Sequence, residues 1–94
     1  MDICCRQHED VVTRRIAGET LLVPIRQHLA DLQRVYVLDE VGASIWNVLD
    51  GTRSDENLAS LLQEEFEVAA DTALADVQRF CRELLNAGLI QVSS

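Results

Sequence analysis

The chain has 94 residues, of which 48% are apolar and 26% charged, and its 16 acidic and 8 basic side chains leave a formal charge of -8. This length supports one domain, because a hydrophobic core is rarely divided below about 100 residues. The acidic balance argues against nucleic-acid and anionic-membrane partners, since both are recognised mainly through Lys and Arg.

The expected location follows from what the sequence lacks. No apolar run approaches the roughly 18 residues of a membrane span, and residues 1–10 lack the apolar stretch of a signal peptide. Three cysteines are an odd number, which fits a reducing compartment better than a disulfide scaffold. We therefore expect a cytoplasmic protein.

Three short strands are expected after a flexible amino-terminal tail, residues 1–10. Aliphatic and β-branched residues concentrate in residues 11–13, 20–25 and 35–38, as is typical of strands. Gly18 supplies the permissive backbone of a tight hairpin between the first two strands.

The middle strand carries two further signals. Leu21, Val23 and Ile25 alternate, which predicts that their face of the sheet meets the helices. Pro24 has no amide donor, so it must lie where that position faces no neighbouring strand, or at a bulge. Residues 26–33 are a polar connection that we expect to be a loop or a single turn.

Three helices follow, each with a capping side chain. Asp39 can cap a first helix over residues 40–50, Ser54 a second and Asp71 a third. Apolar residues recur at helical spacing in each: Val41, Ile45, Val48 and Leu49, then Leu58, Leu61, Leu62 and Phe66, then Leu74, Val77, Cys81, Leu84 and Leu85.

The order of these elements predicts the fold class. Gly88 ends the third helix, and residues 89–92 form a short extended piece. The expected fold is therefore α+β, a three-stranded antiparallel sheet followed by three helices, in a single domain of residues 11–94.

No side chains suited to catalysis converge along the sequence. His8 and His28 lie in segments that we expect to be exposed. Cys4 and Cys5 are adjacent, which is not the spacing of structural zinc sites, and Cys81 holds an inward helical position. No glycine-rich phosphate loop is present. We expect no enzyme activity, no metal and no cofactor.

Two aromatic residues bear on the packing. Trp46 lies at a helical position typical of core residues. Phe80 lies at the rim of the third helix's apolar stripe, so it faces either the core or a groove beside it.

Residues 36–51 read Tyr-Val-Leu-Asp-Glu-Val-Gly-Ala-Ser-Ile-Trp-Asn-Val-Leu-Asp-Gly. This spacing resembles the PqqD family of peptide chaperones, or recognition elements for ribosomally made, modified peptides, at Leu38, Asp39, Gly42, Ile45, Trp46, Leu49 and Gly51. Residues 87–90 are similar to the family's ending, so the resemblance spans about residues 11–92. Glycine in a first helical turn costs about 1 kcal/mol, which predicts a close approach by another element at Gly42.

The resemblance implies a winged helix-turn-helix-like fold whose third strand is an open edge. In such proteins the leader part of a precursor peptide adds as a further strand, and its side chains enter the cleft between the third strand and the third helix. Carried onto this sequence, the implied peptide-binding residues are Arg34, Val35, Tyr36, Val37 and Leu38 on the strand and Asp76, Val77, Arg79, Phe80, Glu83 and Leu84 on the helix.

Two functional hypotheses follow. The resemblance implies a leader-peptide chaperone that serves a modifying enzyme, such as a radical-SAM maturase of the SPASM type. The alternative is a winged-helix DNA-binding regulator, but Asp71, Asp76 and Glu83 offset Arg79 and Arg82 on the helix that would enter the major groove. An open edge strand also allows pairing with a second copy, so the protein is expected to be a monomer or an edge-strand homodimer.

Overall fold

The computed structural model describes residues 4–26, 29–30 and 34–93. Within these residues the fold is α+β, with three helices and two small antiparallel sheets. The strands are β1 (Cys4–Gln7), β2 (Val11–Ile16), β3 (Glu19–Arg26), β4 (Leu29–Ala30), β5 (Tyr36–Leu38), β6 (Asp50–Ser54) and β7 (Ile90–Ser93), and the helices are α1 (Glu40–Trp46), α2 (Asp55–Glu65) and α3 (Ala70–Ala87). No helix in these ranges is both long enough and apolar enough to cross a membrane.

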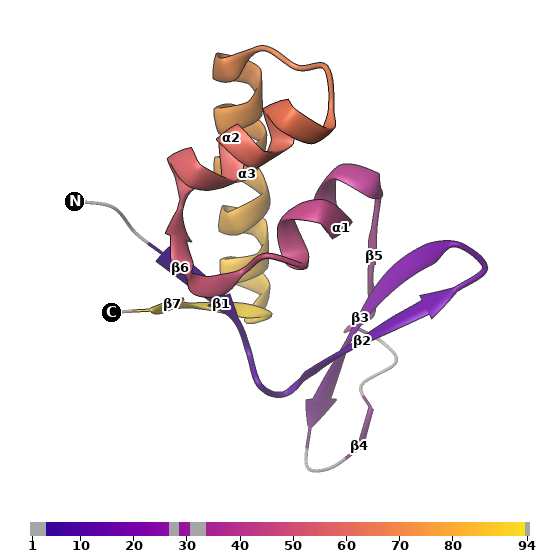
Figure 1. Ribbon diagram of the computed structural model, residues 1–94. Coiled ribbons are helices and arrows are strands. Elements are labelled where there is room, and N and C mark those ends of the chain that lie inside the picture. Colours follow the sequence, from indigo (N-terminus) through magenta and orange to yellow (C-terminus); the bar gives the residue numbers. More distant parts are fainter. Residues whose placement is uncertain (1–3, 27–28, 31–33, 94) are drawn as a thin grey trace.

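The expected hairpin forms between β2 and β3 and projects away from the helices (Figure 1). Ala17 and Gly18 make its two-residue turn, with φ of 53° and 83°. Two positive φ values define the type I′ turn that matches strand twist, and glycine adopts one without strain. On its other side β3 pairs with β5, and the short β4 pairs with Ile25 and Arg26. The three predicted strands therefore adjoin in the order β2, β3, β5, and the connection expected to be a loop also contributes a strand.

Pro24 lies within β3, opposite Val11 of β2. The amide of the next residue, Ile25, donates to the carbonyl of Asp10 at 2.6 Å. Since successive backbone amides point to opposite edges of a strand, the Pro24 nitrogen faces away from β2. Among the residues that the structure describes, neither β5 nor β4 pairs with Pro24, so no ladder bond there needs its missing donor.

The second sheet corrects two expectations, the flexible tail and the single sheet. Cys4–Gln7, expected within that tail, form the central strand β1 between β6 and β7. The pairing satisfies backbone groups on both sides of β1 and buries Cys5, which is 5% exposed. The strand order is also interrupted, since β6 lies between α1 and α2 where a helix end was expected.

Two of the three helices, α1 and α2, begin at the expected capping side chains. The Asp39 carboxylate accepts the amide of Gly42 at 2.7 Å. Ser54 and Asn57 form a reciprocal capping box at the start of α2, which satisfies two amides left free at a helix start. Gly88 is the C-cap of α3.

Three details of the helices differ from the sequence-based expectation. α1 ends at Trp46, several residues earlier than expected. α3 begins at Ala70, so Asp71 lies in its first turn and does not cap it. Leu61 and Leu85, expected to face inward, are 37% and 36% exposed, because each lies at the rim of its helix's apolar stripe.

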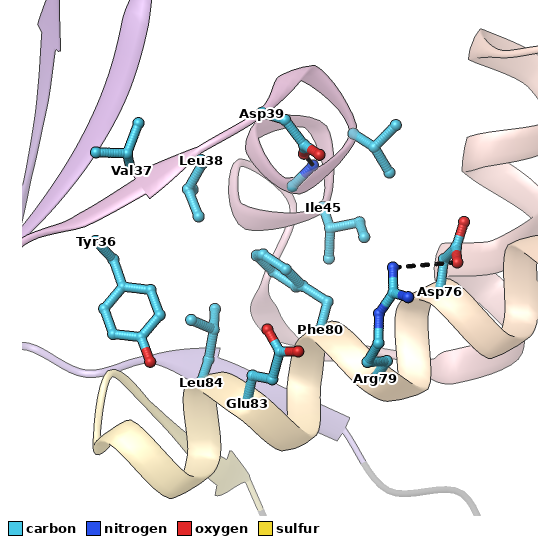
Figure 2. A pocket seen from close by; sticks show the side chains of 12 residues that line it. Tyr36, Val37, Leu38, Asp39, Ile45, Asp76, Arg79, Phe80, Glu83 and Leu84 are labelled. Carbon is cyan, nitrogen blue, oxygen red and sulfur yellow. Dashed lines mark hydrogen bonds and ion pairs between the residues drawn. The ribbon is translucent and has the colours of Figure 1, made fainter.

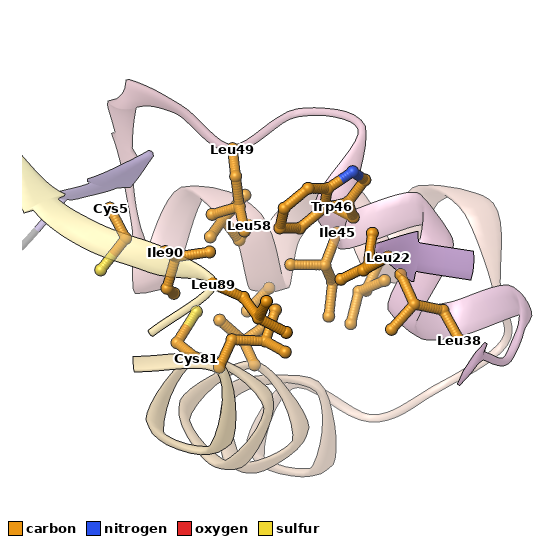
Figure 3. Packing of buried hydrophobic residues seen from close by; sticks show 14 of the residues in the cluster. Cys5, Leu22, Leu38, Ile45, Trp46, Leu49, Leu58, Cys81, Leu89 and Ile90 are labelled. Carbon is orange, nitrogen blue, oxygen red and sulfur yellow. The ribbon is translucent and has the colours of Figure 1, made fainter. Parts of the chain in front are cut away.

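The core packs the helices against both sheets, with Leu22 and Leu38 from one sheet and Cys5 and Ile90 from the other (Figure 3). It holds Leu22 at 0% and Trp46 at 1% exposure. The indole Nε1 of Trp46 donates to the Thr13 hydroxyl at 2.8 Å, and Thr13 lies opposite Leu22 in the sheet. Paired residues share a face, so the inner face carries Thr20 and Leu22. The expectation that Leu21, Val23 and Ile25 would meet the helices is wrong by one residue. Val23 is buried at 8% exposure, but it lies on the opposite face and is not part of the core cluster. The run of consecutive apolar residues from Leu21 to Val23 made both registers possible.

Candidate functional site

The outer edge of β5 is open along the described part of the chain, where β5 pairs with β3 alone. The register settles which backbone groups face this edge. Since Ile25 donates toward β2, alternate residues of β3, Thr20 and Leu22, present their amides and carbonyls to β5. Their partners Leu38 and Tyr36 point back to β3. The amide and carbonyl of Val37 therefore face outward.

A groove of about 360 Å³ runs beside this edge (Figure 2). Its walls come from β5, from α1 with its N-cap, and from one face of α3. The lining residues are Tyr36, Val37, Leu38, Asp39, Val41, Gly42, Ile45, Asp76, Arg79, Phe80, Glu83 and Leu84. The groove is thus apolar at its floor and charged along its rim.

The α3 wall follows from helical geometry. Its five residues, at positions 76, 79, 80, 83 and 84, have the spacing of a single helix face. Val77 was expected in the groove as well, but it is 0% exposed and belongs to the core. One residue along a helix turns the side chain by about 100°, which takes Val77 from the groove face to the buried face.

Gly42 lies close to the Phe80 side chain of α3 in the groove. A β-carbon built at this position would lie 3.0 Å from Cε1 of Phe80 and 3.2 Å from the Asp39 carboxylate. The close approach predicted from the cost of glycine in a first helical turn is present, and the approaching element is α3. Phe80 packs against the core and also lines the groove, so both interpretations of this residue apply.

The strand residues expected in the site divide into two groups. Tyr36, Val37 and Leu38 line the groove. Arg34 and Val35 precede β5 and do not line the groove. The Arg34 guanidinium instead donates to the carbonyl of Ala87 at 3.2 Å. This bond holds the start of β5 against the last turn of α3.

Four groove residues come from α1 and its N-cap and were not expected in the site: Asp39, Val41, Gly42 and Ile45. The sequence signal for them was Gly42. A glycine in the first turn of a helix indicates that another element packs closely there. The other residues of that turn are then expected to lie beside the same element. The neighbour itself, Phe80, could not be named without the tertiary structure.

The charges along the rim are unequal. Arg79 pairs with Asp76 at 3.4 Å, and this ion pair is visible in Figure 2. Asp39 accepts the Gly42 amide. Glu83 is exposed and has no hydrogen bond or ion pair within the described residues. The groove therefore has three carboxylates and one guanidinium, with only one carboxylate neutralised by a cation.

The reactive groups lie away from the groove. Within residues 4–26, 29–30 and 34–93, no three His, Cys, Asp or Glu side chains converge as a metal site would require; His28 lies outside these ranges. Burial raises the pKa of the Cys81 thiol to about 12, and burial also raises the pKa of Cys5. Both thiols are thereby kept protonated and unreactive near neutral pH.

Two comparisons with known proteins bear on this arrangement. The family described as "Coenzyme PQQ synthesis protein D (PqqD)" matches residues 19–90. A solved structure described as "TbiB1 in Complex with the TbiA(beta) Leader Peptide" matches with a TM-score of 0.74 and 26% sequence identity, over 92% of this chain and 94% of that one. No curated protein sequence matches the chain significantly. The family match contains β5, α1 and α3, the three elements that form the groove.

Proposed function

The chain belongs to the PqqD family, and from that premise we propose that it is a non-catalytic peptide chaperone. It binds the leader of a ribosomally made precursor peptide by strand addition and presents that peptide to a modifying enzyme. The observation that carries the proposal is the open edge of β5 directly beside a groove. The similarity to TbiB1, whose structure is described as a complex with a leader peptide, supports the same function.

Strand addition fits the backbone geometry of β5. An extended peptide would exchange hydrogen bonds with the outward amide and carbonyl of Val37. The peptide residue opposite Val37 would share its face, which is away from the core, since Val37 is 59% exposed. The two flanking peptide residues would lie opposite Tyr36 and Leu38, and their side chains would enter the groove. Main-chain bonds would thus supply affinity, and two side chains, two residues apart, would supply selectivity.

The chemistry of peptide modification would belong to the partner enzyme. The groove holds no nucleophile paired with a base among its lining residues, and its buried features are apolar. A radical-SAM maturase of the SPASM type is the partner that we propose, on the family resemblance. The peptide-binding residues are those that line the groove, with Arg34 holding the start of β5 in place.

A DNA-binding role fits the same α3 face poorly. Arg79 is paired with Asp76, and Glu83 stands on the same face. Recognition of DNA draws its affinity from cations that neutralise phosphates, and this face offers more carboxylates than cations.

The proposal is tested by an amide-resolved NMR titration. The first ligand is the TbiA(beta) leader peptide, and the second is a precursor peptide identified by searching the genes next to this one. We expect the Val37 amide to shift and become protected from exchange, and the side chains of Arg79, Phe80 and Glu83 to be perturbed. α2 should remain nearly silent, because none of its residues line the groove.

Two outcomes of the titration would contradict the proposal. Perturbations centred on α2, or no perturbation at about 1 mM of either peptide, a concentration at which even weak complexes form, would contradict the proposal. Sedimentation of the free protein is the control, since pairing of the β5 edge between two copies would protect Val37 without any peptide.

A further inference from the structure

Resting on the proposed function for the identity of the partner, we propose that the seam between α1 and α2 is a second docking site. It takes one large apolar side chain that projects from a basic surface of the modifying enzyme. The shape of the seam, the position of its carboxylates and its separation from the leader groove each support this assignment.

The seam contains a hollow of about 230 Å³. Its walls come from α2 and from α1 with the turn after it, and they are mainly aliphatic: Ser44, Ile45, Val48, Leu58, Leu61, Leu62, Glu64 and Glu65. The hollow is smaller than the roughly 300–1,000 Å³ of small-molecule sites. Its size instead suits a single anchor side chain, which is how partner proteins fill apolar pockets.

The apolar side of the hollow is incompletely covered by the chain itself. Leu58, Leu61 and Leu62 share one face of α2, since their spacing is three and four residues. Leu58 and Leu62 are 2% and 3% exposed, whereas Leu61 is 37% exposed. An apolar side chain placed against Leu61 would remove the remaining surface from water.

The last turn of α2 carries two carboxylates that the helix itself disfavours. Glu64 and Glu65 lie at the negative end of the helix dipole, and no basic residue accompanies them there. Cations are the side chains that stabilise a carboxyl-terminal turn. The Ser44 hydroxyl donates to Glu65, but Glu64 has no partner among the described residues. A residue that breaks a local rule with no compensating contact is expected at a functional site.

The cations of this chain do not neutralise the carboxylates beside the seam. α2 has acidic residues in its first and last turns and no Lys or Arg. Arg15 lines a neighbouring hollow together with Glu40 and Glu65, yet within the described residues it forms no ion pair with either. Lys or Arg on a partner surface would complement this charge.

A second copy of the chain fits the seam less well than a basic enzyme surface. The hairpin offers one exposed apolar side chain beside basic residues, Ile16, which is 59% exposed and follows Arg14 and Arg15. Ile16 is paired across the hairpin with the carboxylate-bearing Glu19, and each copy has a formal charge of -8. Both features oppose docking of the hairpin beside Glu64.

The seam and the leader groove can be occupied at the same time. α1 contacts both β5 and α2 (Figure 1). The two hollows share only Ile45 among their lining residues, and that side chain is 1% exposed. An enzyme bound at the seam would therefore leave the β5 edge to the leader, as presentation of the peptide requires.

The test uses the full chain loaded with its precursor peptide. The probe is the modifying enzyme identified in the same gene search as that peptide. Affinity is measured by isothermal titration, and the docking site by NMR of Leu and Val methyl groups. We expect the enzyme to shift the methyl signals of Val48 and Leu61, which the peptide alone leaves unchanged.

Two variants probe the apolar and the charged part of the seam. Leu61→Gln keeps a helix-forming residue at a partly exposed position and should weaken enzyme binding about 5- to 30-fold. Glu64→Gln should weaken it about 2- to 5-fold at about 0.1 M salt, and less at about 1 M. The same variant should raise the unfolding temperature by about 1–8 °C, because it removes a carboxylate from the unfavourable end of α2.

Glu56→Gln is the matched control. It makes the same change in the first turn of α2, outside the hollow, so enzyme binding should be unchanged. The unfolding temperature should fall, since a carboxylate is favourable in a first turn. All three variants should bind the precursor peptide like the parent protein.

The outcomes separate the docking site from the proposed function. Unchanged enzyme binding in Leu61→Gln and Glu64→Gln, an equal loss in Glu56→Gln, or no enzyme-induced shift of Leu61 would overturn the inference. So would a shift of Leu61 caused by the peptide alone, or self-association that Leu61→Gln abolishes. The proposed function stands in the first three cases if the peptide still perturbs Val37, and a peptide that leaves Val37 unperturbed would remove that function instead.

Discussion

Replacing Val37 by proline should weaken peptide binding at least about tenfold while leaving the domain folded. The Val37 amide faces the open edge of β5 and donates nothing to β3, because the pairing with β3 is made by Tyr36 and Leu38. Proline removes that one donor, and edge strands tolerate proline where the amide faces solvent. The side chain is 59% exposed, so its loss leaves no cavity.

The expected loss of binding free energy follows from the one hydrogen bond that the Val37→Pro variant cannot make. A backbone hydrogen bond contributes about 0.5–1.5 kcal/mol net, and a peptide carbonyl buried without a donor costs about 1–3 kcal/mol. The proline ring would occupy the place of that donor and leave the carbonyl unpaired. The dissociation constant should therefore rise at least about tenfold, which corresponds to 1.4 kcal/mol.

The assay is isothermal titration of the precursor peptide, with circular dichroism and thermal unfolding of each variant. Val37→Thr is the matched control, since it keeps the amide and should bind like the parent. Leu38→Pro is the opposite control. It removes a bond to β3 and a side chain that is 8% exposed, and should cost about 2–5 kcal/mol of stability. A folded Val37→Pro protein that binds the peptide with unchanged affinity would refute strand addition at this edge.

Three further outcomes are expected. Phe80→Asp should weaken peptide binding by about 1–3 kcal/mol in titration, whereas Leu85→Asp, which also places a carboxylate on α3 but at an exposed site, should not; equal weakening would argue against the groove. Trp46→Phe should lower the unfolding free energy by about 1–3 kcal/mol, and Thr13→Val, which removes only the acceptor of the indole, by about 1 kcal/mol; no loss in denaturant melts of either would contradict the buried bond. Because burial raises the pKa of Cys81 from 9.0 to about 12, the folded state favours the protonated thiol, so stability should be full below pH 9 and fall between about pH 9 and 12; a Cys81→Ala variant with the same decline in pH-dependent melts would show that another group titrates.

Local signals predicted much of the helical part of the site. Asp39 and Ser54 cap α1 and α2 as expected, since a capping side chain bonds to amides two or three residues along the chain. The position of Gly42 predicted a close contact before its partner was known. These features depend on residues near one another in the sequence.

The acidic, one-domain composition, the capped helices, the hairpin turn and the resemblance at residues 36–51 were thus determined by the sequence itself. Only the tertiary structure decided that Leu22 faces inward, that Val77 is buried while Phe80 lines the groove, and that Cys4–Gln7 form the centre of a second sheet. β1 pairs with strands that begin at residues 50 and 90, so no local pattern encodes it. A strand with apolar residues on both faces can turn either face toward the core. Which face of β3 is buried depends on contacts with residues distant in the chain.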